Sequence, residues 1–466
     1  MMLSSLLCIP FIYLMNSKGL NYGLLTLGII IGGFIVFLSL FKYISGIYII
    51  TGLGFVIFTL SRLIYQDLPL GTILEILIFS TTIGMLVAQK LKNKIFGIHF
   101  NHPFIILFIL YLVYIFLSIS NPAMNSKVGW VNEFKRDLAL FCFFFLIYLG
   151  LNNLKQQYQF SRFLIALCII SGLYGCYQEF FGYAEFEMNY ITSSEKRRKL
   201  LFMISGVKRK FSLFSDPSSY GITMAATANI LLAMIGNVRF SWKTVVYIIL
   251  MIICLMGLAF SGTRTAYLAF AAGAAFYLLI TINKLATRIL GIILFLGFGF
   301  IMLVPIYSNP TLNRIKSAFD LDSEASLNVR DVNRKSIQPY LHSHPFGGGP
   351  GTTSGSGMKY NPNHVLAGFE TDSGYLKIAT ELGWIALLLL LLQYFLIIKE
   401  GLVIYFSTNK KEIKILILGC LVCVFTFIIA QYAQVAVGQF PDSFLFFGAA
   451  AIIMKTSFNF RQNKTT

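Results

Sequence analysis

Charged side chains are too scarce in this chain to cover the surface of a water-soluble protein of its size. Only 12% of the 466 residues are Asp, Glu, Lys or Arg, whereas 57% are hydrophobic, and the mean hydropathy is +0.74. Soluble domains carry about 25% charged residues and roughly 45–50% apolar ones. The composition therefore excludes a soluble enzyme, a disordered chain and a fibrous protein, and it predicts an integral membrane protein.

Long apolar runs recur along the whole sequence. A membrane-spanning helix needs about 20 mostly apolar residues, and these runs are too long and too weakly alternating for the strands of a β-barrel. We therefore expect an all-α polytopic membrane protein, a bundle of about 12–14 transmembrane helices. The expected spans lie near residues 2–16, 20–41, 43–60, 70–89, 103–120, 137–151, 163–181, 218–236, 243–260, 265–282, 288–305, 373–398, 413–434 and 443–455.

A single long polar stretch divides this bundle. The predicted organisation is helices 1–11 within residues 1–305, including a basic outer loop at 182–217, then an extracytoplasmic loop at 306–372, helices 12–14 within 373–455 and a cytoplasmic tail at 456–466. Long ordered loops in compact proteins usually carry a function. We expect the loop at 306–372, called the outer loop below, to cover a cavity at the membrane surface.

The basic residues divide unevenly between the two sets of loops. One set of short loops, together with the tail, holds 17 Lys and Arg residues, whereas the other set holds 6 outside two long segments, 182–217 and 306–377. Short basic loops face the cytoplasm. We therefore expect both termini in the cytoplasm.

The segment at 182–217 contains seven cations, in the stretch Lys196-Arg-Arg-Lys199 and again at Lys208, Arg209 and Lys210. This stretch could form an interfacial helix on anionic lipid headgroups, or it could bind an anionic substrate. The net charge of +18 is compatible with both. Nucleic acid is not expected as a partner, because there is no soluble basic domain to bind it.

Cysteine and histidine patterns point to neither a disulfide framework nor a metal site. All seven cysteines lie in apolar runs, and the pair Cys420 and Cys423 has no His or acidic neighbour, so we interpret them as small core residues. His342, His344 and His364 lack an orienting carboxylate and a cysteine. We predict no metal and no cofactor.

The glycine cluster at 344–357 has two interpretations. No Gly-Lys-Ser/Thr follows it, so it is not a Walker loop. Successive glycine amides could form an anion-binding nest, or the cluster could be a plain flexible turn. In the same loop, Val332, Ile337 and Leu341 have roughly helical spacing and predict a short helix over 330–342.

Arg264 lies in a short polar break between two apolar spans. An arginine at a membrane boundary is costly to bury, and it is normally paired, functional or extended to the interface. Thr263 could cap the helix that follows. A guanidinium beside a helix N-terminus would bind phosphate, although Arg264 could also be an ordinary interface residue.

Asp372 opens the span that follows the outer loop, where its carboxylate could cap the helix. Glu381 lies nine residues further along the same helix, about 13 Å deeper at a rise of 1.5 Å per residue. A carboxylate at that depth must pair or face water, so Lys377, four residues earlier, is its expected partner.

Four stretches of the chain carry a family resemblance by their order, their spacing and their side of the membrane. These stretches are Arg209-Lys-Phe-Ser-Leu-Phe-Ser-Asp-Pro217, Ser261-Gly-Thr-Arg264, Arg330 with His344-Pro-Phe-Gly-Gly-Gly-Pro-Gly351, and Asp372-Ser-Gly-Tyr-Leu376 with Glu381-Leu-Gly383. Through them the chain resembles the O-antigen ligase and O-antigen polymerase superfamily of bacterial envelope glycosyltransferases. The corresponding family motifs are Arg-x-x-Gly-x-Phe-x-x-Pro-Asn, Ser-x-Ser-Arg, Arg then His-Pro-Leu-x-Gly-x-Gly, and His-Asn-x-Tyr-Leu with Glu-x-Gly.

Several positions depart from these motifs, and the main departure is at Asp372. Ser212 and Ser218 replace the family's Gly and Asn, and Asp372 stands where the family has His. The ligases rely on that His, so its replacement favours a divergent polymerase.

The resemblance implies a multi-pass protein of the cytoplasmic (inner) membrane that transfers glycan on the extracytoplasmic face, without metal or nucleotide. It implies polymerisation of undecaprenyl-diphosphate-linked repeat units into a surface polysaccharide. The alternatives are an O-antigen ligase, with lipid A core as acceptor, and a lipid-linked glycan transporter or flippase. The implied partners are the carrier-linked donor, a glycan or lipid A core acceptor, membrane lipids and a chain-length regulator.

The same resemblance assigns roles to individual residues. We expect Arg209 and Arg264 to bind the departing diphosphate, with Arg330 assisting, because cations placed on developing charge stabilise the transition state. Asp372 is the expected base for the acceptor hydroxyl, and His344 is the second choice. Lys210, His344 and Tyr375 complete the expected substrate-binding set.

Overall fold

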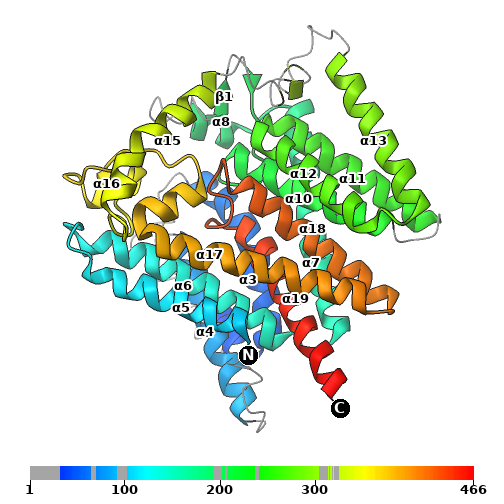
Figure 1. The fold of residues 1–466 in the computed structure, drawn as a ribbon, viewed down its shortest axis with the longest axis horizontal. Coiled ribbons are helices and arrows are strands. Elements are labelled where there is room, and N and C mark those ends of the chain that lie inside the picture. The colour runs from blue at the N-terminus through cyan, green and yellow to red at the C-terminus, as the bar shows by residue number, and fades with distance from the viewer. Residues whose placement is uncertain are drawn as a thin grey trace, which may run out of the picture.

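The computed structural model describes residues 32–64, 70–91, 102–192, 202–204, 207–236, 241–303, 313, 315–316, 319 and 325–465. In this part of the chain nearly all secondary structure is helical (Figure 1). A short apolar helix over Gly32–Phe41 comes first. The other helices are α3 (Tyr43–Ile64), α4 (Leu70–Leu91), α5 (Pro103–Leu117), the short 3-10 helix η1 (Ser118–Ser120), α6 (Lys127–Gly150), α7 (Leu154–Phe180), α8 (Glu185–Thr192), α10 (Pro217–Ile235), α11 (Trp242–Ser261), α12 (Arg264–Thr281), α13 (Leu285–Leu303), α15 (Ala325–Ser343), α16 (Ser354–Tyr360), α17 (Gly374–Ser407), α18 (Lys411–Ala430) and α19 (Asp442–Thr465).

Ten of the described helices are long and apolar enough to cross a membrane. Two shorter apolar helices accompany them, namely Gly32–Phe41 and the Leu285–Gly297 part of α13. The prediction of an all-α polytopic membrane protein is therefore confirmed. The first expected span, 2–16, lies outside the described residues, as does most of the second, and the expected tail at 456–466 continues α19 as a helix up to Thr465.

Strand structure is confined, among the described residues, to one small hairpin. The strands β1 (Met203–Ile204) and β2 (Val207–Lys208) pair antiparallel, with Met203 opposite Lys208. The hairpin lies in the basic segment 182–217, immediately before Arg209. The basic stretch at 196–199 lies outside the described residues, so both interpretations of it stay predictions.

The interior of the bundle is built around α10, α18 and α19, most of whose residues are buried. Small side chains such as Ala225, Ala226 and Ala228 on α10 are fully buried and let neighbouring helices approach closely. By contrast, α13 stands apart from the other helices in Figure 1, and its side chains, including Ile292 and Phe295, are largely exposed. Apolar side chains exposed on a membrane helix face lipid.

Local sequence signals explain where several helices begin. Asp216 has extended backbone geometry and accepts hydrogen bonds from the amides of Ser218 (2.8 Å) and Ser219 (3.0 Å), while Pro217 takes the first helical position of α10. An acidic cap followed by proline is a strong helix start. Gly262 ends α11 in the left-handed region at φ 57°, which allows the sharp turn into α12.

The outer loop contains the helix that the sequence predicts over 330–342. It is part of α15, in which Ile337 and Leu341 pack against Leu366 and Ala379. Val332, the third residue of the predicted pattern, is 63% exposed, because it does not share the buried face of this helix.

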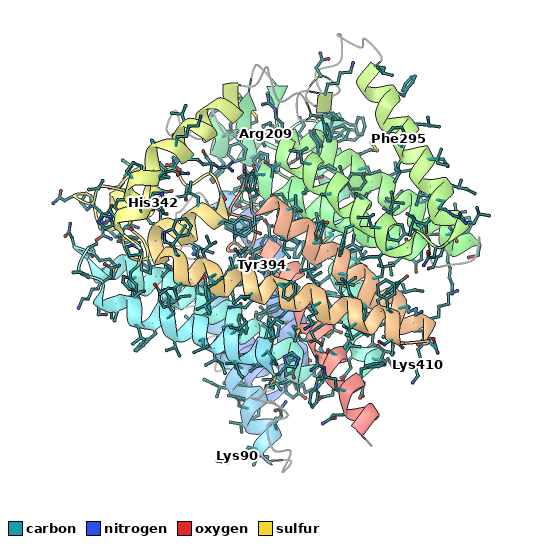
Figure 2. The ribbon with its side chains drawn as sticks, in the orientation of Figure 1. Lys90, Arg209, Phe295, His342, Tyr394 and Lys410 are labelled. Carbon is teal, nitrogen blue, oxygen red and sulfur yellow. The ribbon has the colours of Figure 1, made fainter. Side chains whose placement is uncertain are left out.

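Residues assigned to opposite membrane faces by charge lie on opposite sides of the molecule. In Figure 2, Lys90 lies at the lower edge and Lys410 at the lower right, both from the short basic loops, whereas Arg209 lies near the top and His342 at the upper left. The helices between them are those long enough to cross a bilayer. The arrangement agrees with the division of the loops into two sets.

Candidate functional site

Arg209 is held against the turn between α11 and α12. Its Nε donates to the carbonyl of Ser261 (3.0 Å) and its Nη2 donates to the hydroxyl of Thr263 (2.7 Å). The side chain is buried, and its own carbonyl accepts from the Tyr183 hydroxyl at 2.6 Å. The first two predicted motifs, 52 to 54 residues apart, are therefore in direct contact.

The same turn places Arg264 at the first residue of α12, where it is half-buried. The expectation that the Thr263 side chain caps α12 is wrong. Thr263 occupies the N-cap position, but its hydroxyl donates to the carbonyl of Pro217 (3.0 Å) while it accepts from Arg209. Thr263 thus links α10, α12 and Arg209.

Two further buried cations complete what we call the basic cluster, consisting of Arg62, Arg209, Lys210 and Arg264. The Lys210 Nζ pairs with the Glu179 carboxylate at 3.1 Å and lies 5.0 Å from the Tyr183 ring centroid. The Lys210 amide donates to the carbonyl of Phe260 (3.0 Å), which ties the segment after β2 to the end of α11.

Arg62 was not among the predicted site residues. It ends an apolar run on α3, and its side chain is 2% exposed. The guanidinium donates to the carbonyls of Ser212 (3.1 Å) and Phe214, and it lies 4.2 Å from the centroid of the Phe211 ring. The signal in the sequence is a lone arginine at the end of an apolar span, which normally has a partner or a function.

Arg330 falls in α15, but its side chain lies outside the described residues. The expectation that it assists Arg209 and Arg264 stays a prediction. In the same helix, Arg334 donates to the hydroxyl (2.8 Å) and the carbonyl (3.0 Å) of Tyr432. This contact ties the outer loop to the segment between α18 and α19.

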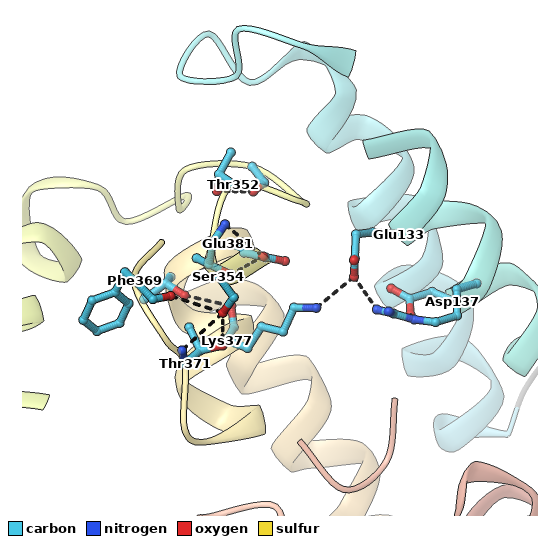
Figure 3. A network of polar contacts seen from close by, with 12 residues as sticks. Glu133, Asp137, Thr352, Ser354, Phe369, Thr371, Lys377 and Glu381 are labelled. Atoms are coloured by element: carbon cyan, nitrogen blue, oxygen red, sulfur yellow. Dashed lines mark hydrogen bonds and ion pairs between the residues drawn. The ribbon is translucent and has the colours of Figure 1, made fainter. Parts of the chain in front are cut away.

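A second polar network joins α6 to α17 (Figure 3). The Lys377 Nζ bonds the Glu133 carboxylate at 2.9 Å, and Arg136 pairs with the same carboxylate. The expected ion pair of Lys377 with Glu381 is not formed, and these two side chains interact only at longer range. Glu133 attracts the lysine because α6 lies across from α17, whereas the Glu381 carboxylate is engaged by the outer loop.

Glu381 forms hydrogen bonds with the outer loop through both its side chain and its backbone. Its carboxylate accepts from the amide (3.4 Å) and the hydroxyl of Thr353, and its carbonyl accepts from the amide of Gly349 at 2.8 Å. The Gly348 amide bonds the carbonyl of Thr380, also at 2.8 Å. The amides of Gly348 and Gly349 therefore bond carbonyls of α17, while the amide of Gly351 interacts with the Glu381 carboxylate, so the anion that this glycine meets belongs to the chain itself.

The docking depends on a break in α17 at Gly383, which has φ 79° and ψ −172°. The carbonyl of Pro345 enters this break and accepts from the Trp384 amide at 3.0 Å. A Cβ atom built on Gly383 would lie 2.0 Å from the Pro345 carbonyl oxygen, so only glycine fits the position. The third and fourth predicted motifs are therefore in contact as well.

Asp372 is not the cap of α17. The N-cap is Ser373, whose hydroxyl accepts from the Leu376 amide (3.4 Å) and donates to the carbonyl of Gln431 (3.2 Å). A serine with extended backbone geometry (φ −132°, ψ 136°) satisfies the helix start one residue later than expected. Asp372 is half-buried and has no hydrogen bond or ion pair within the described residues.

Tyr375 and His344 have structural contacts of their own. The Tyr375 hydroxyl donates to the carbonyl of Ile428 at 2.8 Å, which binds the start of α17 to α18. His344 is exposed, and its ring stacks on Tyr340 with centroids 4.1 Å apart. Its Nδ1 lies 2.9 Å from the Ser343 hydroxyl.

His364 lies near this stack and is half-buried. Its Nδ1 accepts from the Leu366 amide at 3.1 Å, and its ring meets the edge of Tyr340. Burial, aided by nearby His344, lowers the pKa of His364 below 6.5. Across the part of the chain that the structure describes, no group of three or more His, Cys, Asp or Glu side chains is arranged to hold a metal ion.

The fold is that of a polytopic all-α membrane protein. A comparison with protein families indicates which class of membrane protein it is. Residues 249–391 match the family model described as O-antigen ligase. This segment runs from α11 into α17 and contains Arg264, His344, Asp372 and Glu381, whereas Arg209 lies outside it. The predicted resemblance to the O-antigen ligase and polymerase superfamily is thereby confirmed over this segment.

A comparison with curated proteins gives no match to the chain. The family suggests glycosyl transfer of the ligase or polymerase type in polysaccharide assembly, carried out by a multi-pass inner-membrane enzyme on lipid-linked glycans.

Proposed function

We propose that this protein polymerises undecaprenyl-diphosphate-linked oligosaccharide repeat units into a surface polysaccharide, such as an O-antigen, capsule or exopolysaccharide. The reaction takes place on the outer face of the cytoplasmic membrane. One observation carries the proposal: Arg209 bonds the turn that ends α11 and places Arg264 at the start of α12, so that a buried and a half-buried arginine meet at this turn.

The chemistry needs a group that accepts negative charge. The acceptor hydroxyl oxygen bonds the anomeric carbon of the donor, the bond from that carbon to the diphosphate breaks, and the diphosphate leaves on its lipid. Arg264 binds the departing oxygens, and the N-terminus of α12 adds its partial positive charge. Arg209 supports Arg264 by fixing the turn, and it adds its own charge to the site.

The proton of the acceptor hydroxyl goes to a base. Asp372 is the candidate, because it is half-buried and its carboxylate has no bonded partner within the described residues. His344 is the second candidate, with an exposed ring. Lys210, Tyr375 and Arg330 remain proposed contacts of the substrate.

A ligase is the second candidate function, and the description of the matching family model favours it. Asp372 favours the polymerase, because it stands where the ligases carry His. The two functions differ only in the acceptor. Purified protein in nanodiscs, given carrier-linked repeats alone, should make a ladder of longer chains. Product that forms only after lipid A core is added would identify a ligase.

The catalytic assignment is tested with Arg264→Ala. Removing one charge-stabilising donor should lower the elongation rate about 10²–10³-fold. Lys359→Ala, which removes an exposed cation elsewhere in the outer loop, should leave the rate unchanged. Wild-type chain lengths from Arg264→Ala protein present in the membrane at normal amounts would contradict the assignment.

A further inference from the structure

The segment 209–217 contacts Thr263 at both of its ends. Arg209, at its start, donates from Nη2 to the Thr263 hydroxyl at 2.7 Å, and that hydroxyl donates to the carbonyl of Pro217, at its end, at 3.0 Å. Thr263 immediately precedes Arg264, the first residue of α12. The conformation of this segment therefore decides how Arg209 and the start of α10 meet the turn that carries Arg264.

The middle of the segment is held in a strained conformation. Ser212 has φ 52°, in the left-handed region that favours glycine, and its side chain is fully buried. A residue other than glycine persists in this region only where the surrounding structure fixes it, and such residues cluster at functional sites. The contacts that fix Ser212 are therefore candidates for a role in the reaction.

Three hydrogen bonds from other helices hold Ser212. Its amide donates to Oε1 of Gln178 on α7 at 2.8 Å, and its hydroxyl donates to the carbonyl of Ser171 on the same helix at 2.6 Å. Its carbonyl accepts from Nη1 of Arg62 on α3 at 3.1 Å. Two helices from different parts of the chain thus determine the conformation of one residue.

Arg62 bonds this turn at two points. While Nη1 donates to Ser212, Nη2 donates to the carbonyl of Phe214, and the guanidinium lies 4.2 Å from the centroid of the Phe211 ring. The side chain is 2% exposed. Because both terminal nitrogens bond the backbone and the side chain is buried, Arg62 is not available to a diphosphate. Its contacts suit a positioning role.

We propose that Arg62 is a positioning residue for glycosyl transfer, which fixes the segment 209–217 and, through it, the places of Arg209 and Arg264 at the departing diphosphate. The assignment rests on the proposed polymerisation, and it adds a residue of α3, outside the segment that matches the family model. The role needs arginine for its geometry, because one planar guanidinium can bond two carbonyls at fixed positions, whereas the lysine ammonium is a point charge on a flexible stem.

The test replaces Arg62 with lysine, which keeps the charge but not the planar group. Purified full-length protein in nanodiscs is given carrier-linked repeats, and rates are taken per amount of folded protein. A displacement of about 1 Å at the reacting groups costs about 10²-fold in rate. We therefore expect kcat to fall about 10- to 100-fold, while the donor KM changes less than about threefold.

The matched control is Arg461→Lys. It removes the same planar group from an ion pair with Glu400. Arg461 lies near the C-terminus, on the side of the molecule away from β1 (Figure 1). Both kcat and donor KM should stay at their wild-type values in this variant.

A double-mutant cycle on kcat separates positioning from a general loss of stability. If Arg62 acts through Arg209, the two residues work as one unit and their separate losses do not multiply. Arg62→Lys should then lower kcat less than about threefold in a chain that already carries Arg209→Lys. Losses that multiply in full, or a wild-type kcat in Arg62→Lys, would overturn the proposal.

A second variant disturbs the same turn from α7. Gln178→Asn is shorter by one carbon, so it withdraws its oxygen from the Ser212 amide. Loss of one such hydrogen bond should lower kcat about 3- to 10-fold, and this loss should again be smaller in the Arg209→Lys background. Gln178→Asn decides the question if Arg62→Lys does not fold, and a wild-type kcat in it would count against the proposal.

Hydrogen exchange needs no turnover, so the two proposals fail separately. Amides within 209–217 should exchange about tenfold or more faster in Arg62→Lys than in the wild type, and at the wild-type rate in Arg461→Lys. Equal exchange in Arg62→Lys and the wild type overturns the role of Arg62 even in an active protein. Faster exchange in a protein that elongates no glycan, with or without lipid A core, contradicts the proposed polymerisation and leaves Arg62 as the residue that fixes the segment.

Discussion

The carboxylate of Glu381 on α17 accepts both the amide and the hydroxyl of Thr353 in the outer loop. Both residues are buried, at 4% and 1% exposure, so water does not compete for these bonds. Beside them, the break at Gly383 exposes backbone groups of α17 that bond Pro345, Gly348 and Gly349. The part of the outer loop at 345–353 is therefore held against a membrane helix and cannot move independently of it.

Replacing Gly383 with alanine should loosen this junction. A non-glycine residue at φ 79° costs about 1–3 kcal/mol, and the added Cβ would also collide with the Pro345 carbonyl. We expect a lower melting temperature in detergent and faster proteolysis within 344–353. Gly355→Ala is the control, because a Cβ there meets nothing within 4 Å. Equal melting temperatures for the two variants would contradict this view of the break.

The Glu381–Thr353 contact can be measured by a double-mutant cycle with Glu381→Gln and Thr353→Val. Hydrogen bonds to charged groups contribute about 1.5–3 kcal/mol, so the two changes together should destabilise the protein by less than the sum of their separate effects. The measurement is thermal unfolding of all four proteins in the same detergent. Simple additivity would indicate that the two groups do not interact.

Removing the lysine that joins α17 to α6 should destabilise the bundle. Lys377→Met leaves the buried Glu133 with Arg136 as its remaining ion-pair partner, and breaking a buried pair from one side costs about 3–5 kcal/mol. Lys377→Met combined with Glu133→Gln should cost less than Lys377→Met alone, because the carboxylate that loses its lysine is then neutral, while Arg136 keeps Asp137 at 3.9 Å. The measurement is thermal unfolding of the single and double variants. A double variant that is less stable than Lys377→Met alone would refute the pairing.

Arg209 should affect the rate through the position of Arg264. Arg209→Lys keeps the charge but cannot bond both Ser261 and Thr263 from a planar group, and a displacement of about 1 Å at a reacting centre costs about 10²-fold in rate. We expect that loss in the elongation rate, with little change in donor KM. An Arg209→Lys variant with the wild-type elongation rate would show that Arg209 does not position Arg264 for the reaction.

Acid should weaken the outer loop through His364. Its pKa in the folded protein lies below 6.5, so the folded state binds fewer protons than the unfolded state between the two pKa values. The contribution of His364 is then complete above pH 6.5 and declines as the pH falls through the lowered pKa. In a thermal-shift series from pH 7.5 to 5, His364→Asn should show a smaller acid-induced loss than the wild type. Asparagine can still accept from the Leu366 amide, and equal pH profiles would exclude His364 as the cause.

Much of this arrangement could be predicted from the sequence, because apolar runs fix the helices. The adjacency of Arg209 to the turn at 261–264 was also implied by the motif order. The partner of Lys377 was not predictable, because Glu133 lies 244 residues away. The first ten residues of α6 include several charged side chains, so they do not look like part of an apolar span. The expected span therefore began at 137, whereas the helix begins at Lys127.

The caps were misassigned for a different reason. Asp372, Ser373 and Thr263 all suit a helix start by residue type. Neighbours from elsewhere in the chain decide which side chain caps its helix. Ser373 caps α17 while it also bonds Gln431, whereas the Thr263 hydroxyl bonds Arg209 and does not cap α12. Local sequence contains no information about those neighbours.

The contact of Arg62 with Ser212 bears on how the protein is made. The two residues are 150 positions apart, and a ribosome that adds about 5–20 residues per second reaches the second roughly 8–30 s after the first. During that interval the newly inserted α3 holds a guanidinium in the membrane without its final acceptors. Until the later segment arrives, this charge in the last turn of α3 has only water or lipid headgroups as partners, so the packing around Arg62 is completed late in synthesis.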